Sequence, residues 1–155
     1  MTVSVITINL NNFDGLKKTL QSVIQQDYKF LQYIVIDGGS TDGSQEYLSY
    51  NSDNISYWVS EKDSGVYDAM NKGIQMATGD VIGLINSDDL FCDTYAIEKV
   101  MNIFIANQKL DSVYADLYYV SQNDTDKITS LNFDNLSFTS NDSFHKNYIE
   151  VRKTC

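Results

Sequence analysis

Three short apolar runs constrain the fold of this chain more than any other feature of its sequence. They span residues 3–8, 31–36 and 81–85. Runs that are apolar at nearly every position are typical of strands covered on both faces, as in a parallel sheet. Between the first two runs, residues 14–25 carry apolar side chains at helical spacing, with Asp14 where a helix N-cap belongs. The pattern therefore predicts a right-handed βαβ unit and an α/β fold built on a mostly parallel sheet.

The same alternation of strands and helices continues to about residue 120. After the second run, Thr41 or Asp42 can cap a helix. The patterns that follow predict a strand over 57–60, helices over 68–77 and 96–107, and a strand over 112–120. Residues 121–143 are rich in Asn, Asp, Ser and Thr, which is typical of loop with weak strand. We therefore expect a core domain over 1–120 and an irregular segment over 121–155.

The composition excludes several classes of partner. The chain has 155 residues, 43% of them apolar, which is enough for one domain with a substantial core. Eleven Lys and Arg residues stand against 21 Asp and Glu residues, so the formal net charge is −10. Such a surface repels nucleic acid and anionic membranes, although an anionic small molecule needs only local donors or a metal ion. With two cysteines and no recognisable signal peptide or transmembrane segment, we expect a cytoplasmic protein.

Polar side chains follow each of the three predicted strands. The first strand leads into Asn9, Asn11 and Asn12, the second into Asp37, and the third into residues 86–89 (Asn-Ser-Asp-Asp). In open α/β sheets the ligand crevice lies outside the carboxyl ends of the strands. Each cluster alone is equally well explained as a solvated loop with a helix cap, because Asn, Asp and Ser are ordinary turn residues. Three such clusters at one edge of the sheet favour a binding site there.

The third cluster is the best candidate for a metal site. Asp88 and Asp89 are adjacent carboxylates, and a hard divalent cation with oxygen ligands relieves their repulsion. Mg²⁺ or Mn²⁺ completes its shell with water and substrate phosphates, which would let an acidic chain hold an anionic ligand. The glycines at 38, 39 and 43 match neither the dinucleotide-binding nor the P-loop spacing, and His145 is the only histidine. Those two nucleotide sites and a histidine-based metal site are therefore disfavoured.

Three segments, in order, resemble the N-terminal half of a family 2 glycosyltransferase. They read VSVITINLNN, IVIDGGSTDGS and SEKDSGVYDAMNKGIQMATGDVIGLINSDD, and the likeness extends from residue 2 to about residue 93. The third segment is the most specific, because it joins a helix, a strand and the acidic motif at the spacing of the family. Its DAMNKG signature is most similar to the bacterial surface-polysaccharide branch.

This resemblance implies a GT-A fold, a Rossmann-like sheet that binds a nucleotide-diphosphate sugar, usually a UDP-sugar, through a divalent metal ion. Asp37 would hydrogen-bond the base, and residues 8–11 would border the base and the ribose. The acid at Asp88, with help from Asp89, would contact Mg²⁺ or Mn²⁺. The donor-binding residues that the resemblance implies are Thr7, Ile8, Asn9, Asn11, Asp37, Asp68, Asn71, Asn86 and Ser87.

Inverting transfer is the reaction that the resemblance implies. A carboxylate base would deprotonate a hydroxyl of a sugar or lipid-linked acceptor, which then displaces the diphosphate. The product would belong to polysaccharide or glycolipid synthesis, which leaves room for peripheral association with the inner face of the membrane. The base has no recognisable match. Asp116 is a weak candidate for it and is equally well explained as a solvent-facing structural residue.

The chain also departs from the family pattern. Leu10 stands where many relatives have an aromatic residue near the base, and Asn86 replaces the first acid of the metal motif. The acceptor side of the family usually lies beyond the length of this chain, so we expect a fragment or a short form in which 121–155 is a partial acceptor-side segment. A non-catalytic nucleotide-sugar-binding fragment is the alternative. A Mg²⁺-dependent receiver-like module is disfavoured because no lysine stands at a late strand end.

Overall fold

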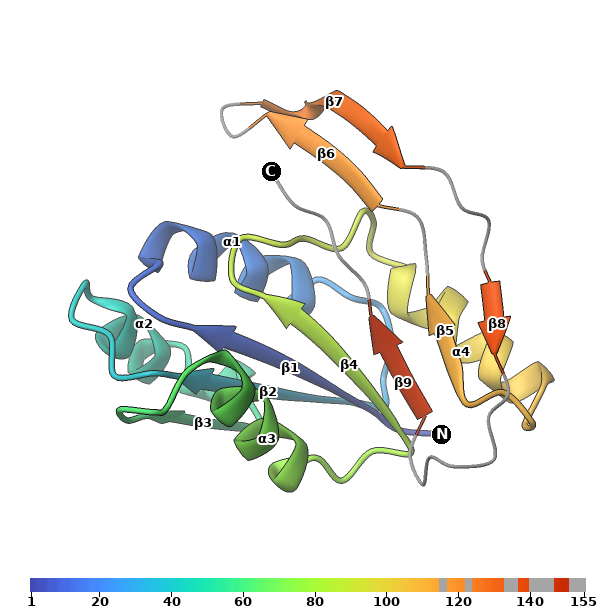
Figure 1. Ribbon diagram of the computed structural model, residues 1–155, viewed down its shortest axis with the longest axis horizontal. Coiled ribbons are helices and arrows are strands. Elements are labelled where there is room, and N and C mark those ends of the chain that lie inside the picture. The colour runs from blue at the N-terminus through green and yellow to red at the C-terminus, as the bar shows by residue number, and fades with distance from the viewer. Residues whose placement is uncertain (115–116, 122–123, 133–136, 140–146, 151–155) are drawn as a thin grey trace.

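The computed structural model describes residues 1–114, 117–121, 124–132, 137–139 and 147–150, with side chains up to residue 113. Its centre is a seven-stranded sheet in the order β3-β2-β1-β4-β9-β5-β8 (Figure 1). Every pairing in this sheet is parallel except that of β8 with β5, which confirms the predicted α/β class. The strands are β1 (Val3–Asn9), β2 (Leu31–Asp37), β3 (Tyr57–Ser60), β4 (Val81–Asn86), β5 (Ser112–Tyr114), β8 (Ser137–Thr139) and β9 (Asn147–Glu150).

The register of the central strands brings the predicted polar clusters to one edge of the sheet. β1 pairs Asn9 with Asp37 of β2, and Ile8 with Asn86 of β4. All three strands therefore end at the same level, and the loops that follow them leave the sheet side by side. This is the edge at which open α/β sheets hold their ligands.

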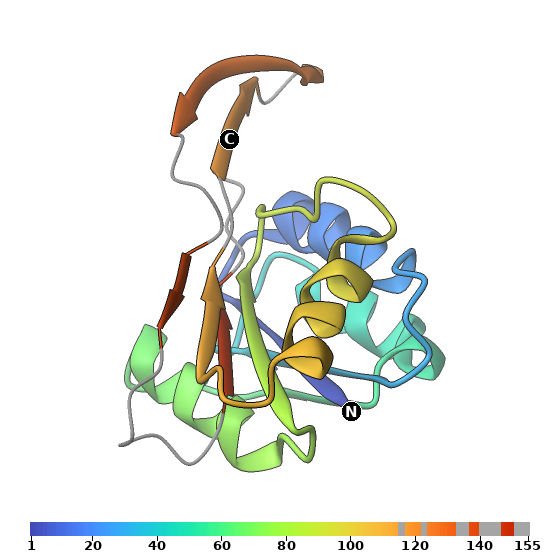
Figure 2. The same cartoon turned by 90° about the vertical axis from the view of Figure 1, so that its right-hand side faces the viewer.

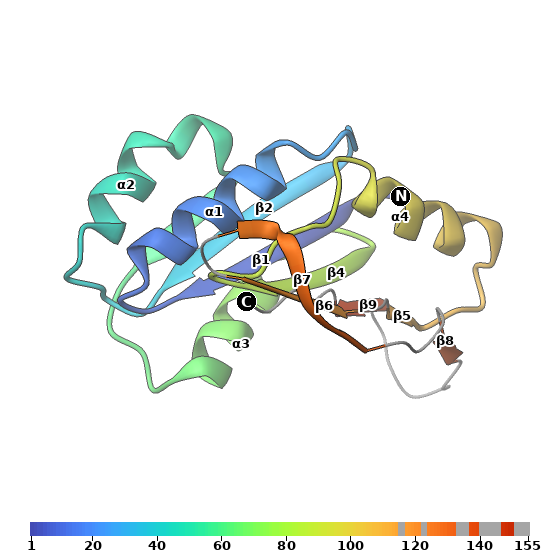
Figure 3. The same cartoon turned by 90° about the horizontal axis from the view of Figure 1, so that it is seen from above.

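Helices cover both faces of the sheet (Figure 3). α1 (Phe13–Ile24), α2 (Ser44–Tyr50) and α4 (Ala96–Ala106) pack on one face, and α3 (Val66–Met76) packs on the other. A 3₁₀ turn, η1 (Ser52–Asn54), precedes β3. α1 turns one apolar stripe to the sheet, so Leu16, Leu20 and Val23 are fully buried. None of the described helices combines the length and the apolar composition that a bilayer span requires.

Two helix starts differ from the sequence prediction. The N-cap of α1 is Asn12, whose side-chain oxygen accepts the Gly15 N–H at 3.2 Å, so the expected cap at Asp14 is wrong. Asp14 instead lies in the first turn, where a negative charge favours the helix dipole. The N-cap of α2 is Gly43, and Asp42 acts one residue earlier by accepting the Ser44 N–H at 3.1 Å.

The chain beyond α4 forms more strand than its composition predicts. The single strand expected over 112–120 is two strands, β5 and β6 (Leu117–Ser121), which belong to different sheets. Part of the predicted loop is β7 (Asp124–Asn132), which pairs antiparallel with β6 in a hairpin that projects from the main sheet (Figure 2). Polar segments form strands where a neighbour supplies backbone partners, which composition cannot show. Asp116 and His145 lie outside the described residues.

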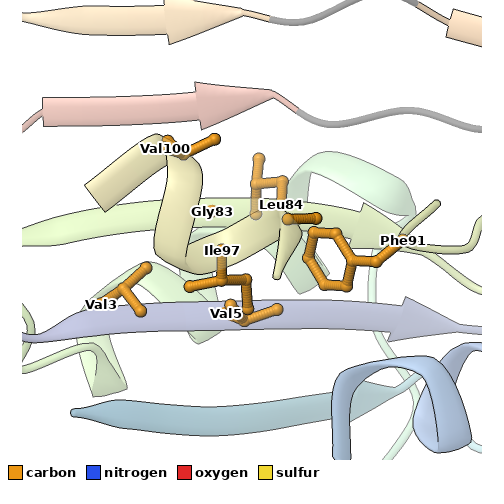
Figure 4. Close-up of a pocket in the computed structure, with 8 residues that line it drawn as sticks. Val3, Val5, Gly83, Leu84, Phe91, Ile97 and Val100 are labelled. Carbon is orange, nitrogen blue, oxygen red and sulfur yellow. The ribbon is translucent and has the colours of Figure 1, made fainter. Parts of the chain in front are cut away.

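A small apolar space lies between α4 and the sheet (Figure 4). Its volume is about 10 Å³, no more than one water molecule needs, and it offers such a water no polar partner. It is therefore a packing defect of the core and not a ligand site. Its lining residues are Val3, Val5, Gly83, Leu84, Phe91, Ala96, Ile97 and Val100.

A glycine sets how closely α3 approaches the sheet, and this yields a test of the packing. A Cβ added at Gly73 would overlap Cγ2 of Ile6, a short branched side chain in β1 that cannot move aside. Overpacking of this kind destabilises by about 1–3 kcal/mol, whereas the higher helix propensity of alanine over glycine stabilises by only ~1 kcal/mol. We therefore expect Gly73→Ala to lower the free energy of unfolding by about 1–2 kcal/mol in urea denaturation.

The matched control is Gln75→Ala, at an exposed position of the same helix. Surface substitutions of this kind stay within about 0.5 kcal/mol of the parent protein. A Gly73→Ala variant as stable as the parent would show that α3 does not pack on β1 as described.

Candidate functional site

A cleft of about 270 Å³ opens at the carboxyl ends of β1 and β4. One wall comes from the ends of these two strands, and the other from the loop before α3 and the first turns of α3. The cleft is close to the lower end of ordinary ligand sites, about 300 Å³, so it suits a nucleoside-sized group. Its lining residues are Ile8, Asn9, Leu10, Asp63, Gly65, Val66, Ala69, Asn86 and Ser87.

Asp37, at the end of β2, lies beneath this cleft and is completely buried. Its Oδ1 accepts hydrogen bonds from Asn9 Nδ2 at 2.7 Å and Ser40 Oγ at 2.6 Å. Its Oδ2 accepts from the Ser40 N–H at 2.9 Å and from Ser60 Oγ at 2.6 Å. The carboxylate thus joins the ends of β1, β2 and β3 and the turn after β2. Burial alone would raise the pKa of Asp37, but the bonds from Ser40, Ser60 and Asn9 outweigh it and hold that pKa below its usual value.

The same network fixes the amide of Asn9. Its nitrogen donates to Asp37, so the orientation of the amide is set by that bond. The opposite atom, Oδ1, is buried and has no hydrogen-bond partner among the described residues. A buried acceptor without a partner costs free energy unless a ligand or a water satisfies it. Asn9 is among the residues that line the cleft, although this oxygen is itself buried.

The acidic turn after β4 is held by α1. Asp88 has a left-handed backbone (φ 84°), and its N–H donates to Thr19 Oγ1 at 2.9 Å. The same hydroxyl donates to the carbonyl of Asp89 at 2.9 Å. Lys18, one residue earlier on α1, places its Nζ 3.3 Å from Oδ1 of Asp88. The helix that follows β1 therefore both shapes this turn and supplies a positive charge beside it.

The two acids of this turn differ in what they can bind. The Asp88 side chain is 32% exposed, whereas Asp89 is 3% exposed and its Oδ2 accepts the Asn86 amide at 3.1 Å. No group of three or more His, Cys, Asp or Glu residues within the described ranges is arranged to hold a metal ion. Mg²⁺ and Mn²⁺ need only one or two carboxylates when a diphosphate and water complete the shell. The residues present fit such an ion: the Asp88 carboxylate would ligate it, and the ion would replace the Lys18 ammonium as the partner of that carboxylate.

The other predicted donor-binding residues differ in where the structure places them. Ile8, Asn9, Asn86 and Ser87 line it. Thr7 is fully buried, with its hydroxyl 3.0 Å from that of Tyr33. Asn11, in the loop after β1, accepts the Thr41 N–H at 2.9 Å. Asp68, on α3, accepts the Ser64 N–H at 3.0 Å and lies 3.8 Å from Lys72. Asn71 is exposed on the same helix. The structure thus gathers four of the nine predicted donor-binding residues into one cavity, and the roles of all nine stay predictions.

Comparison with known families agrees with this geometry. The profile of glycosyl transferase family 2 matches residues 4–153, nearly the whole chain. The chain belongs to this family. An uncharacterized glycosyltransferase of Mycobacterium tuberculosis is 50% identical over 91 residues, a match that covers 58% of this chain and 35% of that relative. The chain therefore spans about a third of the length of that family 2 relative.

Two solved structures have a fold similar to that of this chain. The mannosyltransferase PcManGT of Pyrobaculum calidifontis, in complex with GDP-Man and Mn²⁺, superposes with a TM-score of 0.64 at 21% identity, over 77% of this chain and 35% of that one. S. aureus TarS 1–349, in complex with UDP-GlcNAc, does so with a TM-score of 0.64 at 18% identity, over 79% of this chain and 35% of that one. At these identities the likeness establishes the GT-A fold of the family 2 chain and nothing finer.

Sequence reasoning missed several residues of the family 2 site. Asp63, Gly65, Val66 and Ala69 line the cleft although none was singled out. They fall within the segment SEKDSGVYDAM that carries the resemblance, so an acid two residues before a glycine at a helix start was an available signal. Lys18 and Thr19 offered no signal, because they occupy ordinary positions in an amphipathic helix.

The buried network of Asp37 yields a pH prediction. A carboxylate with a lowered pKa stabilises the fold above its ordinary pKa, and this contribution is lost as the pH falls below about 4. Asp37→Asn turns one acceptor into a donor facing donors, and each unsatisfied buried group costs about 1–3 kcal/mol. We expect the variant to be less stable by roughly that amount at pH 7, with the difference from the parent shrinking below pH 4.

Urea denaturation of both proteins between pH 7 and pH 3 measures this difference. Asp53→Asn, an exposed site in η1 with the same change of charge, is the control and should follow the parent protein. A pH-independent gap between Asp37→Asn and the parent would contradict an ionised, hydrogen-bonded Asp37.

Proposed function

We propose that this family 2 chain binds a nucleotide-diphosphate sugar, specifically a UDP-sugar, and transfers its glycosyl group to a sugar or lipid-linked acceptor. The observation that carries the proposal is the cleft that joins the ends of β1 and β4 directly beside the Asn86–Asp89 turn. Both solved neighbours hold a nucleotide sugar, which supports this class of donor. The acceptor class, polysaccharide or glycolipid, and a cytoplasmic setting at the inner membrane face belong to the same proposal.

The donor would lie with its base toward Leu10 and its diphosphate toward Asp88. Leu10 is 58% exposed at the mouth of the cleft, so an apolar ring can pack on it. At the other end, Asp88 would hold Mg²⁺ or Mn²⁺, which when bound neutralises the charge of the leaving diphosphate. Lys18, whose Nζ lies 3.3 Å from Oδ1 of Asp88, would add positive charge on the same side. Its charge would thus lie near the point where the donor carries its negative charge.

The transfer we propose is an inverting displacement. The acceptor oxygen bonds to the anomeric carbon from the side opposite the diphosphate while the bond from that carbon to the diphosphate oxygen breaks. A carboxylate base takes the proton of the acceptor hydroxyl. Val66 and Ala69 contribute apolar surface to the wall of the cleft. Asp116 stays the candidate base from the sequence.

Donor binding yields the next prediction. We expect titration calorimetry to show UDP binding with Mn²⁺ or Mg²⁺ that weakens at least about tenfold in EDTA, and Asp88→Ala to lower the affinity by a similar factor. Asp89→Ala should affect UDP binding less, because that carboxylate is buried against Asn86. Asp53→Ala serves as the control for loss of one negative charge. Equal UDP affinity with and without the ion would contradict the metal assignment.

Transfer is tested by following UDP release from a panel of UDP-sugars, with and without sugar and lipid-linked acceptors. We expect release with one donor of the panel, at a rate that Asp88→Ala lowers by about 10²-fold or more. The physical reason is that the charge of the leaving diphosphate grows as its bond breaks, so losing the ion costs more in the transition state than in binding. Metal-dependent UDP binding without release from any donor would contradict transfer.

A further inference from the structure

Asp37, the carboxylate that the resemblance assigns to the nucleobase, has no free lone pair with which to bind it. Asp37 is completely buried, and its two oxygens already accept four hydrogen bonds. Two lone pairs on each oxygen account for all four bonds. A base N–H could reach Asp37 only by displacing one of these internal donors and leaving it unpaired. The geometry favours Asp37 as a positioning residue that holds the strand ends together.

A second carboxylate lies against the same turn and faces the cleft. A Cβ at Gly38 would come within 2.8 Å of Oδ2 of Asp63 and within 3.3 Å of Cδ1 of Leu10. The absence of a side chain at Gly38 therefore makes room for the Asp63 carboxylate beside Leu10. Asp63 reaches this point from the loop between β3 and α3, and it lines the cleft.

The Asp63 side chain is held in place by one of its oxygens. Its Oδ1 accepts the Gly65 N–H at 2.9 Å, at the start of α3. Its Oδ2 has no hydrogen-bond or ion-pair partner within the part of the chain that the structure describes. The loop itself is anchored, because the Glu61 N–H donates to the carbonyl of Asp37 at 3.0 Å. The turn after β2 approaches so closely that a Cβ at Gly39 would lie 3.1 Å from the Lys62 nitrogen.

We propose that Asp63 reads the nucleobase of the donor by accepting a ring N–H through Oδ2, an inference that rests on the proposed function. Uracil and guanine each carry a ring N–H beside a carbonyl, whereas adenine and cytosine present a ring nitrogen with a lone pair at the corresponding place. A fixed carboxylate attracts the first pair and repels the second. Leu10, exposed at the mouth of the same cleft, offers an apolar surface for the face of the base.

The test compares nucleotide binding by calorimetry at saturating Mn²⁺, with UDP, GDP, CDP and ADP as the ligands. We expect the parent protein to bind UDP or GDP at least tenfold more tightly than CDP and ADP, and the UDP and GDP arms show which of the two bases fits. Asp63→Asn should lower the affinity for the preferred nucleotide roughly ten- to a hundredfold, as for a lost hydrogen bond to a charged group. The ratio of that affinity to the affinity for CDP should fall as well. Asp53→Asn, with the same change of charge at a distant exposed site, should match the parent protein.

A second variant tests the geometry without touching the carboxylate. Gly38→Ala places a methyl group where Oδ2 of Asp63 lies, and the far end of that side chain can move aside, so the fold should persist. We expect this variant to lose base selectivity in the same direction as Asp63→Asn, and Asp63→Ala to lose it fully.

The outcomes separate this inference from the proposed function. If Asp63→Asn keeps the affinities of the parent protein for all four nucleotides, the role of Asp63 is wrong while donor binding stands. If a folded Asp37→Asn variant changes the preference and Asp63→Asn does not, Asp37 is the base acceptor. If the parent protein binds none of the four nucleotides, the proposed function itself fails.

Discussion

The buried carboxylate of Asp37 is the interaction on which the architecture of the site depends. Single backbone hydrogen bonds link the residues that follow β2, β3 and β4 to a neighbouring strand, and a side-chain network adds to them at this edge. Asp37 forms that network by accepting from Asn9 of β1, from Ser40 in its own turn and from Ser60 of β3. A buried charge is costly unless it is fully hydrogen-bonded, and here four donors satisfy it. The network therefore fixes three loops relative to one another, which preorganises the cleft above it.

Glycines after β2 serve the same end by a different means. Gly39 adopts a positive φ of 83° and lies close to the backbone of Lys62. Any side chain there would both strain the turn and push the β3–α3 loop away. The glycine pair, whose spacing matches no phosphate-binding loop, is thus explained by the close packing of two loops at the edge of the cleft.

Charge in this protein is distributed to suit an anionic ligand despite a formal net charge of −10. Two of the acids near the cleft have their charge compensated within the fold: Asp37 is buried in hydrogen bonds, and Asp88 is paired with Lys18. Lys72 likewise lies 2.9 Å from Glu61 on the other side of the β3–α3 loop. Local pairing of this kind lets a diphosphate approach an acidic surface, because a short-range field at the site outweighs a screened net charge.

The strands, the parallel sheet, the edge of the sheet with the cleft and the family could be predicted from the sequence, because apolar runs and strand-end clusters are signals of local order along the chain. The sequence predicted Asn9, Asn86 and Ser87 at the cleft for the same reason. Only the tertiary structure shows that the Asp37 carboxylate is buried with four hydrogen bonds while Asp63 lines the cleft with one oxygen unpaired. This difference depends on the distances between loops that are 26 residues apart in the chain. The tertiary structure also decided that Lys18 faces Asp88 and that β9 joins the main sheet, because side-chain pairing and strand partners are set by packing across the fold and leave no trace in local sequence.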